Sequence, residues 1–492
     1  MPTMPISSRA RPCPSMAAST CTEAPRLQDR SQHPHATSNS RTAMNTPPVK
    51  DIPFWLEAAP LRAVGADAPL PARCDVLVVG AGYSGLSTAL HLARAGRDVV
   101  VIDQDEPGRH ASTLNFGALG RTIRPKFKQV IEAYGLETAT RMFREAKAWM
   151  EFAIDFIREE QIDCKFRRAG RFYACHTPEA YESLARDMEL QQKHLPTDTY
   201  MVPRAEQHRE VGSDTYFGLQ VLADVGQVHS GRYFAGILDR TLAAGVRVFS
   251  RARAEGFARE GAGHRVRTSR GTIEAKELAL CTNAVTGTHA PLLRHFRRRI
   301  IPVHNWTTIT KPTDEATYRA ILPGEKMLLE TVLLYTGLRP IDEDRRFVVA
   351  ARHLFEHTDA AEAGAASIAQ VAENIPAFAR LEASHCWKGH FAMTFDWLPH
   401  LGTDRTSGAH YLLGLVGTGV PSSLYFGHKL ANRILGRKEG ETVYADRPFP
   451  TRPFYNGKPE WFLPFARTYY RTRDFRARDR ALAKHGPLKR TA

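Results

Sequence analysis

Residues 74–96 read CDVLVVGAGYSGLSTALHLARAG, and this stretch carries the clearest structural signal in the chain. Its apolar run Asp75–Val79 predicts a short buried strand, and the apolar residues from Leu86 to Ala93 recur at the spacing of a helix. A second apolar run, Val99–Ile102, predicts another buried strand. The order strand, turn, helix, strand is that of a βαβ unit and predicts an α/β domain.

The turn of this unit holds a Gly-x-Gly-x-x-Gly motif at Gly80, Gly82 and Gly85. Gly80 permits a tight turn, Gly82 lets the backbone approach a pyrophosphate at the helix N-terminus, and Gly85 lets the helix pack closely on the strand. Asp103 ends the next strand, where its carboxylate can accept hydrogen bonds from a ribose. The motif predicts a dinucleotide site without choosing between FAD and NAD. A tight turn without a nucleotide is the alternative.

Length and composition limit the class of protein. The chain has 492 residues. One hydrophobic core serves about 250–300 residues, so two domains with accessory segments are expected. Hydrophobic residues make up 43% and charged residues 24%, which excludes a mostly disordered, collagen-like or polytopic membrane protein. The sequence predicts neither a membrane span nor a signal peptide, so we expect a cytoplasmic protein.

The basic charge of the chain is concentrated near its two ends. The formal net charge is +15, of which residues 1–50 hold +4 and residues 464–492 hold +7. Such tails are typical of solvated segments, and contact with nucleic acid is the less favoured alternative. The seven cysteines show no C-x-x-C and no histidine at zinc spacing, so neither a disulfide framework nor a metal site is predicted.

Several separated blocks resemble one known family, the FAD-dependent amino-acid and amine oxidases, which include D-amino-acid oxidase and the glycine and sarcosine oxidases. The resemblance is strongest to the γ-glutamylputrescine oxidoreductase branch and covers roughly residues 53–470. The blocks are residues 74–96, GQVHSGRYFAGILDRTLAAGVRV at 226–248, LCTNAVT at 280–286, CWKGHFAMTFDWLPHLG at 386–402, YLLGLVGTGV at 411–420 and RPFYNGKPEWFLP at 452–464.

The resemblance implies a mixed α/β (α+β) fold. It consists of a Rossmann-like FAD-binding domain with an inserted substrate domain built on a mostly antiparallel sheet. A hairpin turn at Asp342-Glu343-Asp344 fits such a sheet. The predicted segments are a disordered leader at 1–50, a lead-in at 51–73, the FAD-binding domain at 74–140, 218–290 and 385–440, the substrate domain at 141–217 and 291–384, and a C-terminal extension with a basic tail at 441–492.

The family's second glycine block, usually Gly-Tyr-Ser-Gly-His-Gly, falls on residues 414–419, where Thr418 replaces the histidine. The resemblance implies a helix that begins after Pro421 and directs its positive end at the flavin ring. That role uses the backbone, so it survives the replacement.

The loop at residues 110–118 resembles the family's loop against the flavin. Ser112, Asn115 and Gly117 match it, whereas Leu114 stands in place of an arginine. The motif and the resemblance together place these residues at non-covalent FAD: Gly80, Gly82, Tyr83, Ser84, Gly85, Asp103, Gln104, Ser112, Asn115, Gly117, Ala254, Asn283, Gly417, Thr418 and Gly419.

Candidate substrate groups follow from the same resemblance. The segment Tyr335–Arg339 is similar to a family strand that ends in Tyr-Tyr-Arg, and Arg339 is expected to face a substrate carboxylate. A solvated or salt-bridged hairpin arginine is the alternative. His390 is a candidate general base, although hydride transfer from a neutral amine needs none. Other candidates are the aromatic residues Trp306, Trp387 and Phe391 as cavity walls, and Cys386 as a covalent flavin link that its register disfavours.

The expected activity is oxidation of the C–N bond of an amine or amino acid, including γ-glutamylated or carboxylated amines, to an imine that hydrolyses. Oxygen or another electron acceptor would reoxidise the reduced flavin. Two alternatives stay open. The first is a flavin-binding protein without amine turnover that acts as an assembly or nucleic-acid partner, and the second is an NAD-dependent dehydrogenase.

Overall fold

The glycine motif follows the central strand of a largely parallel sheet. The structure is a computed structural model that describes residues 48–287, 294–351 and 357–488. Strand β1 (Arg73–Val79) pairs in parallel with β2 (Val99–Ile102) and with β11 (Gly271–Leu280), and helix α2 (Tyr83–Arg94) connects β1 to β2. The predicted βαβ unit is therefore confirmed.

The full sheet has eight strands. Five of them, β18, β11, β1, β2 and β8, run in parallel, so their carboxyl ends lie at the same edge. Ligands of such sheets bind at this edge. Of the parallel strands, β8 spans Arg247–Phe249 and β18 spans His410–Leu413. The remaining three strands of the sheet are β9 (Ala254–Glu260), β10 (Gly263–Thr268) and β17 (His400–Thr403).

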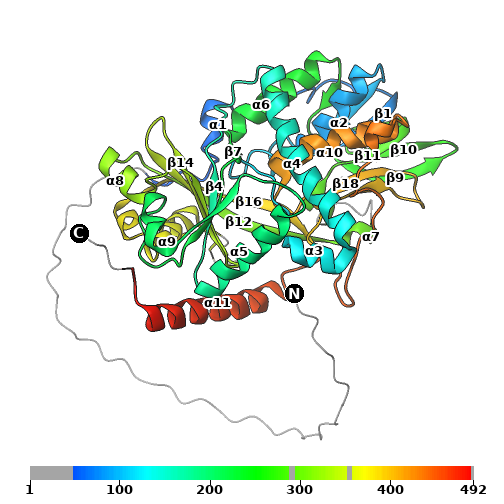
Figure 1. Cartoon of the computed structure of the whole chain (residues 1–492). Helices are drawn as coiled ribbons and strands as arrows, with labels where there is room; N and C mark the ends of the chain where they lie inside the picture. Colours follow the sequence, from blue (N-terminus) through cyan, green and yellow to red (C-terminus); the bar gives the residue numbers. More distant parts are fainter. Residues whose placement is uncertain (1–47, 288–293, 352–356, 489–492) are drawn as a thin grey trace, which may run out of the picture. The chain divides into compact units, whose positions relative to one another are not determined.

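Alternate side chains of β1 enter two different cores. Val76 and Val78 pack in one cluster with apolar residues of α2, α6 (Ser230–Ala243) and α10 (Gly419–Ile434), which cover one face of the sheet (Figure 1). Leu77 and Val79 face the opposite side and pack with residues of β10 and β11. This alternation is the two-residue period of a strand buried on both faces.

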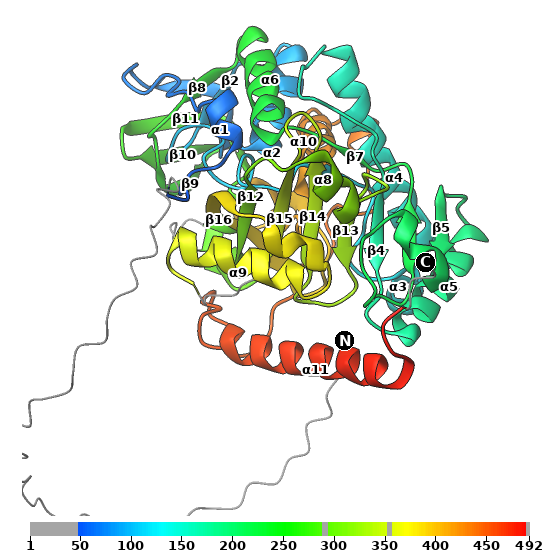
Figure 2. The same cartoon turned by 90° about the vertical axis from the view of Figure 1, so that its left-hand side faces the viewer.

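A second sheet of eight strands is mostly antiparallel, as expected, with one parallel pair between β4 and β13. Helix α9 (Ala360–Ala372) covers one of its faces (Figure 2). In spatial order the strands are β16 (Ala383–Thr394), β12 (Ile300–Thr310), β15 (Arg346–Ala351), β14 (Thr336–Ile341), β13 (Met327–Glu330), β4 (Arg171–Ala174), β6 (Leu219–Leu222) and β5 (Thr199–Val202).

Other elements join or flank the two sheets. The short ribbon of β3 (Ala118–Leu119) and β7 (Gly226–Gln227) forms a separate pair. The remaining helices are α1 (Trp55–Ala58), α3 (Phe127–Tyr134), α4 (Leu136–Glu159), α5 (Pro178–Gln192), α7 (Arg294–Arg297) and α8 (Glu315–Ile321), with 3₁₀ turns at 204–209, 283–287, 376–380 and 438–440. All described residues belong to one compact unit, so the predicted domain boundaries stay a prediction.

Two sequence-based expectations need correction. Helix α10 begins at Gly419 rather than after Pro421, because a proline in the first helical turn gives up a backbone donor that has no partner there. Most of the predicted disordered leader lies outside the described residues. Its end does not, since the Lys50 N–H donates to the Ser384 carbonyl at 3.0 Å beside β16.

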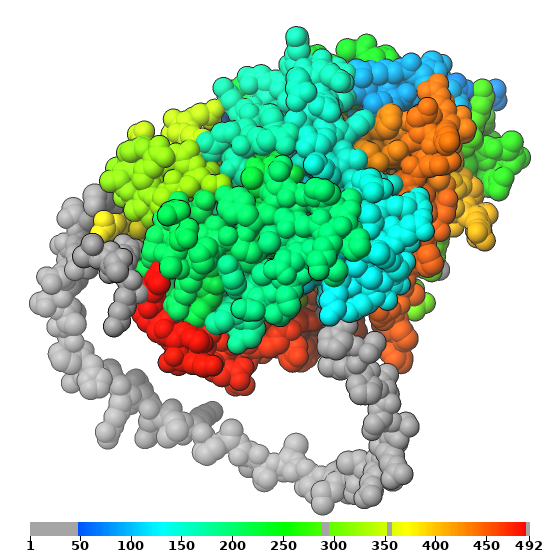
Figure 3. Space-filling view, viewed as in Figure 1, coloured from blue at the N-terminus to red at the C-terminus, as the bar shows by residue number. Residues whose placement is uncertain are grey.

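The basic C-terminal tail is also more ordered than its composition suggests. Residues Leu463–His485 form helix α11, whose red surface meets green mid-chain segments in Figure 3. Asp474 accepts a hydrogen bond from the Leu333 N–H at 3.3 Å, and Arg478 pairs with Glu373 at 3.1 Å. This helix could not be predicted from the sequence, because its many charged residues leave no regular apolar stripe.

Candidate active site

The glycine motif is shaped by close backbone contacts. Gly80 has φ +107°, and a Cβ atom there would lie 2.8 Å from the Cys281 carbonyl oxygen. A Cβ at Gly85 would overlap the Gly80 carbonyl, so only glycine lets α2 approach β1 this closely. A Cβ at Gly82 would lie 3.0 Å from the Ser112 hydroxyl oxygen. The turn therefore presents bare backbone at the start of α2, as a phosphate-binding turn requires.

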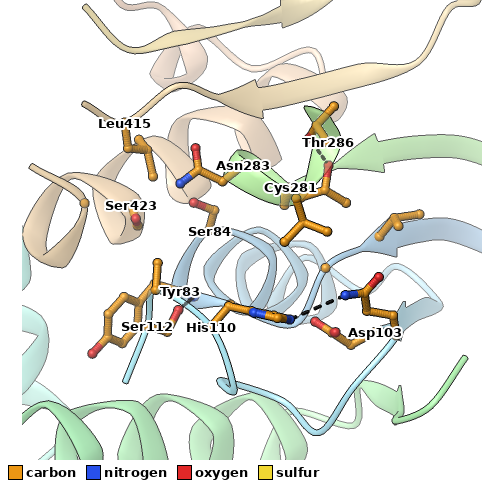
Figure 4. A pocket seen from close by; sticks show the side chains of 18 of the residues that line it. Tyr83, Ser84, Asp103, His110, Ser112, Cys281, Asn283, Thr286, Leu415 and Ser423 are labelled. Atoms are coloured by element: carbon orange, nitrogen blue, oxygen red, sulfur yellow. Dashed lines mark hydrogen bonds between the residues drawn. The ribbon is translucent and has the colours of Figure 1, made fainter. Parts of the chain in front are cut away.

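A cavity opens directly in front of this turn (Figure 4). It is lined by residues that follow β1, β2 and β11 and by the start of α10. Of the fifteen predicted cofactor residues, all but Gly85, Gly117 and Thr418 line it. Phe391, a predicted cavity wall, also lines it. Lining residues that the sequence did not reveal are Val79, Ile102, His110, Ala111, Ala252, Arg253, Cys281, Thr282, Val285, Thr286, Leu415, Val420 and Ser423.

Asp103 lies at the end of β2 and is held by backbone donors. Its Oδ2 accepts from the Ala81 N–H at 2.6 Å, and its Oδ1 accepts from the Asp105 N–H at 3.1 Å. Burial raises the pKa of the Asp103 carboxyl, although these two N–H donors act in the opposite direction. The carboxylate lines the cavity one strand away from the glycine turn, which is the arrangement that a dinucleotide ribose requires.

The second glycine block closes the other side of the cavity. Gly414 and Gly417 have φ +70° and +77°, and the Gly414 N–H donates to the Asn283 Oδ1 at 3.0 Å. The Thr418 hydroxyl donates to the Leu415 carbonyl at 2.9 Å, so this threonine ends the turn before α10. Helix α10 thus presents its positive end to the cavity with a hydroxyl in place of the family's imidazole.

The loop at residues 110–118 joins this cavity to a second one. The Ser112 hydroxyl accepts from the Tyr83 N–H at 3.0 Å, which fixes the loop against α2. Asn115 Oδ1 accepts from the Gly117 N–H and from the Ser230 hydroxyl, both at 2.8 Å. Leu114 has its carbonyl bonded to the indole N–H of Trp387 at 3.3 Å.

The second cavity lies over the inner face of the mostly antiparallel sheet. It shares Ala111, Asn115, Phe391, Gly417 and Val420 with the first, so the two cavities adjoin. Two arginines line it, and no Asp or Glu is among its described lining residues. The further lining residues are Leu114, Phe116, Gly117, Ala118, Gly120, Thr122, Arg124, Arg171, Tyr173, Asn305, Leu329, Tyr335, Ala350, Gly389, His390, Thr418 and Pro421.

Arg124 stands where the two cavities meet. Its Nε donates to the Val416 carbonyl at 2.9 Å, and its guanidinium lies 5.7 Å from the centre of the Tyr335 ring. A Cβ at Gly417 would lie 2.6 Å from the Arg124 Nη2, so Gly417 leaves room for this cation. Burial lowers the pKa of Arg124, but Tyr335 outweighs that effect, and the net shift is upward. The side chain stays charged.

Arg339 is not placed as the sequence predicted. It is 3% exposed, and its Nη1 donates to the Val228 carbonyl at 2.8 Å and the Gly117 carbonyl at 3.5 Å. Phe116 and Gly117 line the second cavity and contact Arg339, which itself does not line it. Burial lowers the pKa of Arg339 to about 9. Arg339 therefore contacts the loop from the side away from the second cavity, where it lines a separate cavity with Trp55 and His229.

The other predicted substrate groups are divided between cavity and core. His390 lines the second cavity, with its ring centre 4.1 Å from that of His304, and Phe391 lines both cavities. Trp306 and Trp387 are buried in apolar clusters instead. Burial lowers the pKa of the His304 imidazole to about 4. The catalytic role of His390 stays a prediction.

Cys386, the candidate for a covalent link, lies away from both cavities. Cys386 packs with Trp306, Ala360 and Ala363, and its thiol lies 3.3 Å from the Thr308 hydroxyl. It lines neither cavity, and burial raises its pKa to about 12. The bare glycine turn, the Asp103 carboxylate in the cavity and the helix end at Thr418 fit FAD, which would be held by the lining residues of the first cavity.

The described part of the chain holds no group of three or more His, Cys, Asp or Glu side chains that could bind a metal ion. No helix among the described residues has the length and apolar character needed to cross a membrane.

Comparisons with known proteins agree with this geometry. The family model of the FAD dependent oxidoreductases (DAO) matches residues 75–433. The chain is 26% identical over 403 residues to the gamma-glutamylputrescine oxidoreductase of Escherichia coli (strain K12), covering 82% of this chain and 93% of the relative.

Two solved structures share the fold. The glycine oxidase of Geobacillus kaustophilus superposes with a TM-score of 0.63 at 18% identity, covering 78% of this chain and 99% of the other. The L-amino acid deaminase of Proteus vulgaris, solved without its specific insertion sequence, gives a TM-score of 0.62 at 17% identity, covering 77% and 95%. With its glycine turn, its second glycine block and this match over most of its length, the chain belongs to the DAO family of FAD-dependent oxidoreductases.

Proposed function

We propose that this protein oxidises the C–N bond of an amine that carries a carboxylate, giving an imine that water hydrolyses. The observation that carries this proposal is the charge of the second cavity. Arg124 and Arg171 line it, and its described lining residues include no carboxylate. A guanidinium pairs with a carboxylate through two parallel hydrogen bonds, so the cavity favours an anionic or zwitterionic substrate.

The position of Arg124 supports this orientation of the substrate. It lies beside Gly417, which lines both cavities, so a carboxylate bound there brings the adjacent carbon to the flavin side. Phe391 also lines both cavities and would hold the apolar part of the substrate at the junction. Bound FAD would supply the acceptor for the hydride that leaves the carbon next to the nitrogen. The chain's own residues orient the amine and exclude water.

The names of similar proteins support the class of reaction. One relative is a gamma-glutamylputrescine oxidoreductase, and the solved structures with the same fold include a glycine oxidase and an L-amino acid deaminase. The glycine oxidase and the L-amino acid deaminase are both named for amino-acid substrates. The identity of the electron acceptor and the cytoplasmic location stay predictions.

A panel of amines and amino acids, with and without carboxylates, tests the proposal. Under exclusion of oxygen, a carboxylated amine is expected to bleach the flavin absorbance of the purified protein, whereas its decarboxylated counterpart should do so far more slowly. Oxygen uptake after mixing with air then identifies oxygen or another acceptor. Flavin bands that no compound bleaches would favour a flavin-binding protein without turnover, and a protein without flavin would favour the NAD alternative.

The variant Arg124→Met separates substrate binding from cofactor binding. Loss of a charged hydrogen bond worth about 1.5–3 kcal/mol predicts a kcat/KM lower by roughly ten- to a hundredfold, with flavin content unchanged. The control is Arg186→Met, because Arg186 lies on the exposed part of α5 and pairs there with Glu182. Equal activity of Arg124→Met and its parent would place the carboxylate anchor elsewhere.

A further inference from the structure

Arg171 is a buried cation that faces the second cavity. Side chains alternate along β4, so Arg171 and Tyr173 point into the cavity while Phe172 enters the core on the other face. The residue is 5% exposed. Its Nη2 donates to two neutral groups, the Thr122 hydroxyl and the Tyr173 hydroxyl, the latter at 3.1 Å.

The hydrogen bonding of Arg171 is incomplete. Its Nε is buried and has no hydrogen-bond partner among the residues that the structure describes. No ion pair joins Arg171 within those residues. Buried donors are almost always bonded, and a buried charge is costly unless a counter-charge lies beside it. An anion bound in the cavity beside Arg171 would supply the counter-charge that the chain itself does not.

The neighbouring Arg121 is also buried, but its charge is paired with a carboxylate of the chain. Arg121 is buried to a similar degree, and its Nε lies 2.6 Å from Asp224 Oδ2 in an ion pair. The chain thus neutralises one of two nearby buried arginines with its own carboxylate and leaves the other facing a cavity. Arg171 therefore lines the cavity without a carboxylate partner among the described residues, and its charge is available to an anionic ligand.

The floor beside Arg171 suits the apolar part of a ligand. Leu329 and Ala350 line the cavity, and Gly337 lies between them in the register of the sheet. A Cβ at Gly337 would lie 2.9 Å from the Leu329 side chain and 3.6 Å from the Phe116 ring, so this position has little space for a larger residue. The result is a shallow apolar surface next to the two arginines.

We propose that Arg171 binds a second carboxylate of the substrate, so that the enzyme acts on amines with two carboxylates. One carboxylate meets Arg124 beside the flavin, and the other meets Arg171 and the hydroxyls of Thr122 and Tyr173. Acidic amino acids and N-carboxyalkyl amino acids have this chemistry. The inference rests on the proposed function, which requires only the carboxylate at Arg124.

Binding of simple acids tests the inference without turnover. Isothermal titration calorimetry of the FAD-containing protein compares glutarate with pentanoate, which has the same number of carbons and one carboxylate, at constant ionic strength. Glutarate is expected to bind more tightly by roughly tenfold or more, the effect of one added charged hydrogen-bond pair. Succinate and adipate extend the series in chain length. If none of the three diacids binds more tightly than pentanoate, the inference is overturned.

Variants then assign the second carboxylate. Arg171→Met is expected to lower glutarate affinity to that of pentanoate while leaving pentanoate unchanged, whereas Arg124→Met should weaken both acids. Arg186→Met is again the control. An equal loss for both acids in Arg171→Met would make Arg171 the single anchor and overturn the inference. Unchanged pentanoate binding in Arg124→Met, with the selective loss kept in Arg171→Met, would contradict the proposed anchor alone.

A second variant tests the inference in case Arg171→Met does not fold. Arg171→Lys keeps a cation of shorter reach at the same place, and we expect it to retain flavin and to bind glutarate with intermediate affinity. Flavin content and circular dichroism of each variant are measured first. Glutarate binding by Arg171→Lys as weak as that of pentanoate would support the need for the planar guanidinium, and binding equal to the parent's would contradict a bidentate contact.

Discussion

The guanidinium of Arg339 donates to the main-chain oxygen of Val228 at 2.8 Å, and its Cζ lies 4.9 Å from the centre of the Trp55 ring. The indole N–H of Trp55 in turn donates to the Asn115 carbonyl at 3.1 Å. These two side chains, one from the second sheet and one from the lead-in segment, hold the loop that carries Asn115 and Gly117. The order of the cofactor site thus depends on residues that do not line it.

Replacement of Arg339 is expected to lower the free energy of unfolding and not to affect substrate binding directly. Arg339→Met removes the donor to two buried carbonyls, and we expect the free energy of unfolding to fall by about 1.5–3 kcal/mol. Denaturant unfolding and flavin retention measure this. The control is Arg345→Met, since Arg345 lies in the turn of the same hairpin, is exposed and donates to the Thr313 carbonyl. Normal stability with weakened pentanoate binding would instead support Arg339 as the carboxylate anchor.

The lead-in segment is expected to be part of the folded enzyme. Trp55 is 1% exposed and packs edge-on against Trp387 and His229. Trp55→Ala should therefore destabilise the protein by about 3–5 kcal/mol, the cost of a large buried cavity. Thermal unfolding followed by intrinsic fluorescence measures the effect, with exposed Trp461→Ala as the matched control. Equal melting temperatures for the two variants would contradict this role.

Gly82→Val is expected to abolish FAD binding while the protein still folds. The added branches would occupy the space in front of the helix start, where the Cβ alone approaches the Ser112 hydroxyl at 3.0 Å. The ratio of flavin to protein absorbance measures the loss. Gly256→Val on β9 is the control, because the atom nearest to a Cβ there is the Arg267 Nη2 at 3.6 Å. Full flavin content in Gly82→Val would move the nucleotide site elsewhere.

Stability is expected to fall between pH 6.5 and pH 4. Burial, with a smaller effect of the nearby charge of Arg339, lowers the pKa of His229 from 6.5 to about 4. Within this range the unfolded chain takes up a proton that the folded protein does not, so the free energy of unfolding falls as the pH is lowered. The dependence ends below the folded pKa.

The variant His229→Asn tests this dependence. Asparagine can still accept from the Arg232 N–H at the start of α6, as His229 Nδ1 does at 3.2 Å, but it does not titrate. Denaturant unfolding at a series of pH values should give a shallower slope than in the parent. His485→Asn on α11 serves as the control. An unchanged slope in His229→Asn would mean that other groups cause the pH dependence.

Local patterns made the nucleotide site predictable from the sequence. The glycine motif, Asp103 and the second glycine block each belong to a strand and the turn that follows it, so short segments specify them. Arg171 had no such signal. Its position depends on the pairing of β4 with β13, which lie more than 150 residues apart in the chain, and no motif marks it. The sequence placed Arg339 at the substrate for the same reason. Phe116 and Gly117 separate it from the second cavity, and this arrangement exists only in the folded protein.

The central position of β1 has a consequence for biosynthesis. Its partner β11 ends at Leu280, and α10, which closes the cofactor cavity, ends at Ile434. A nascent chain on the ribosome therefore holds its glycine turn for most of translation without the strands that complete the site. Pairing over such long separations is slow, and unpaired strand edges invite aggregation meanwhile. The complete cofactor site can therefore form only after synthesis has passed α10.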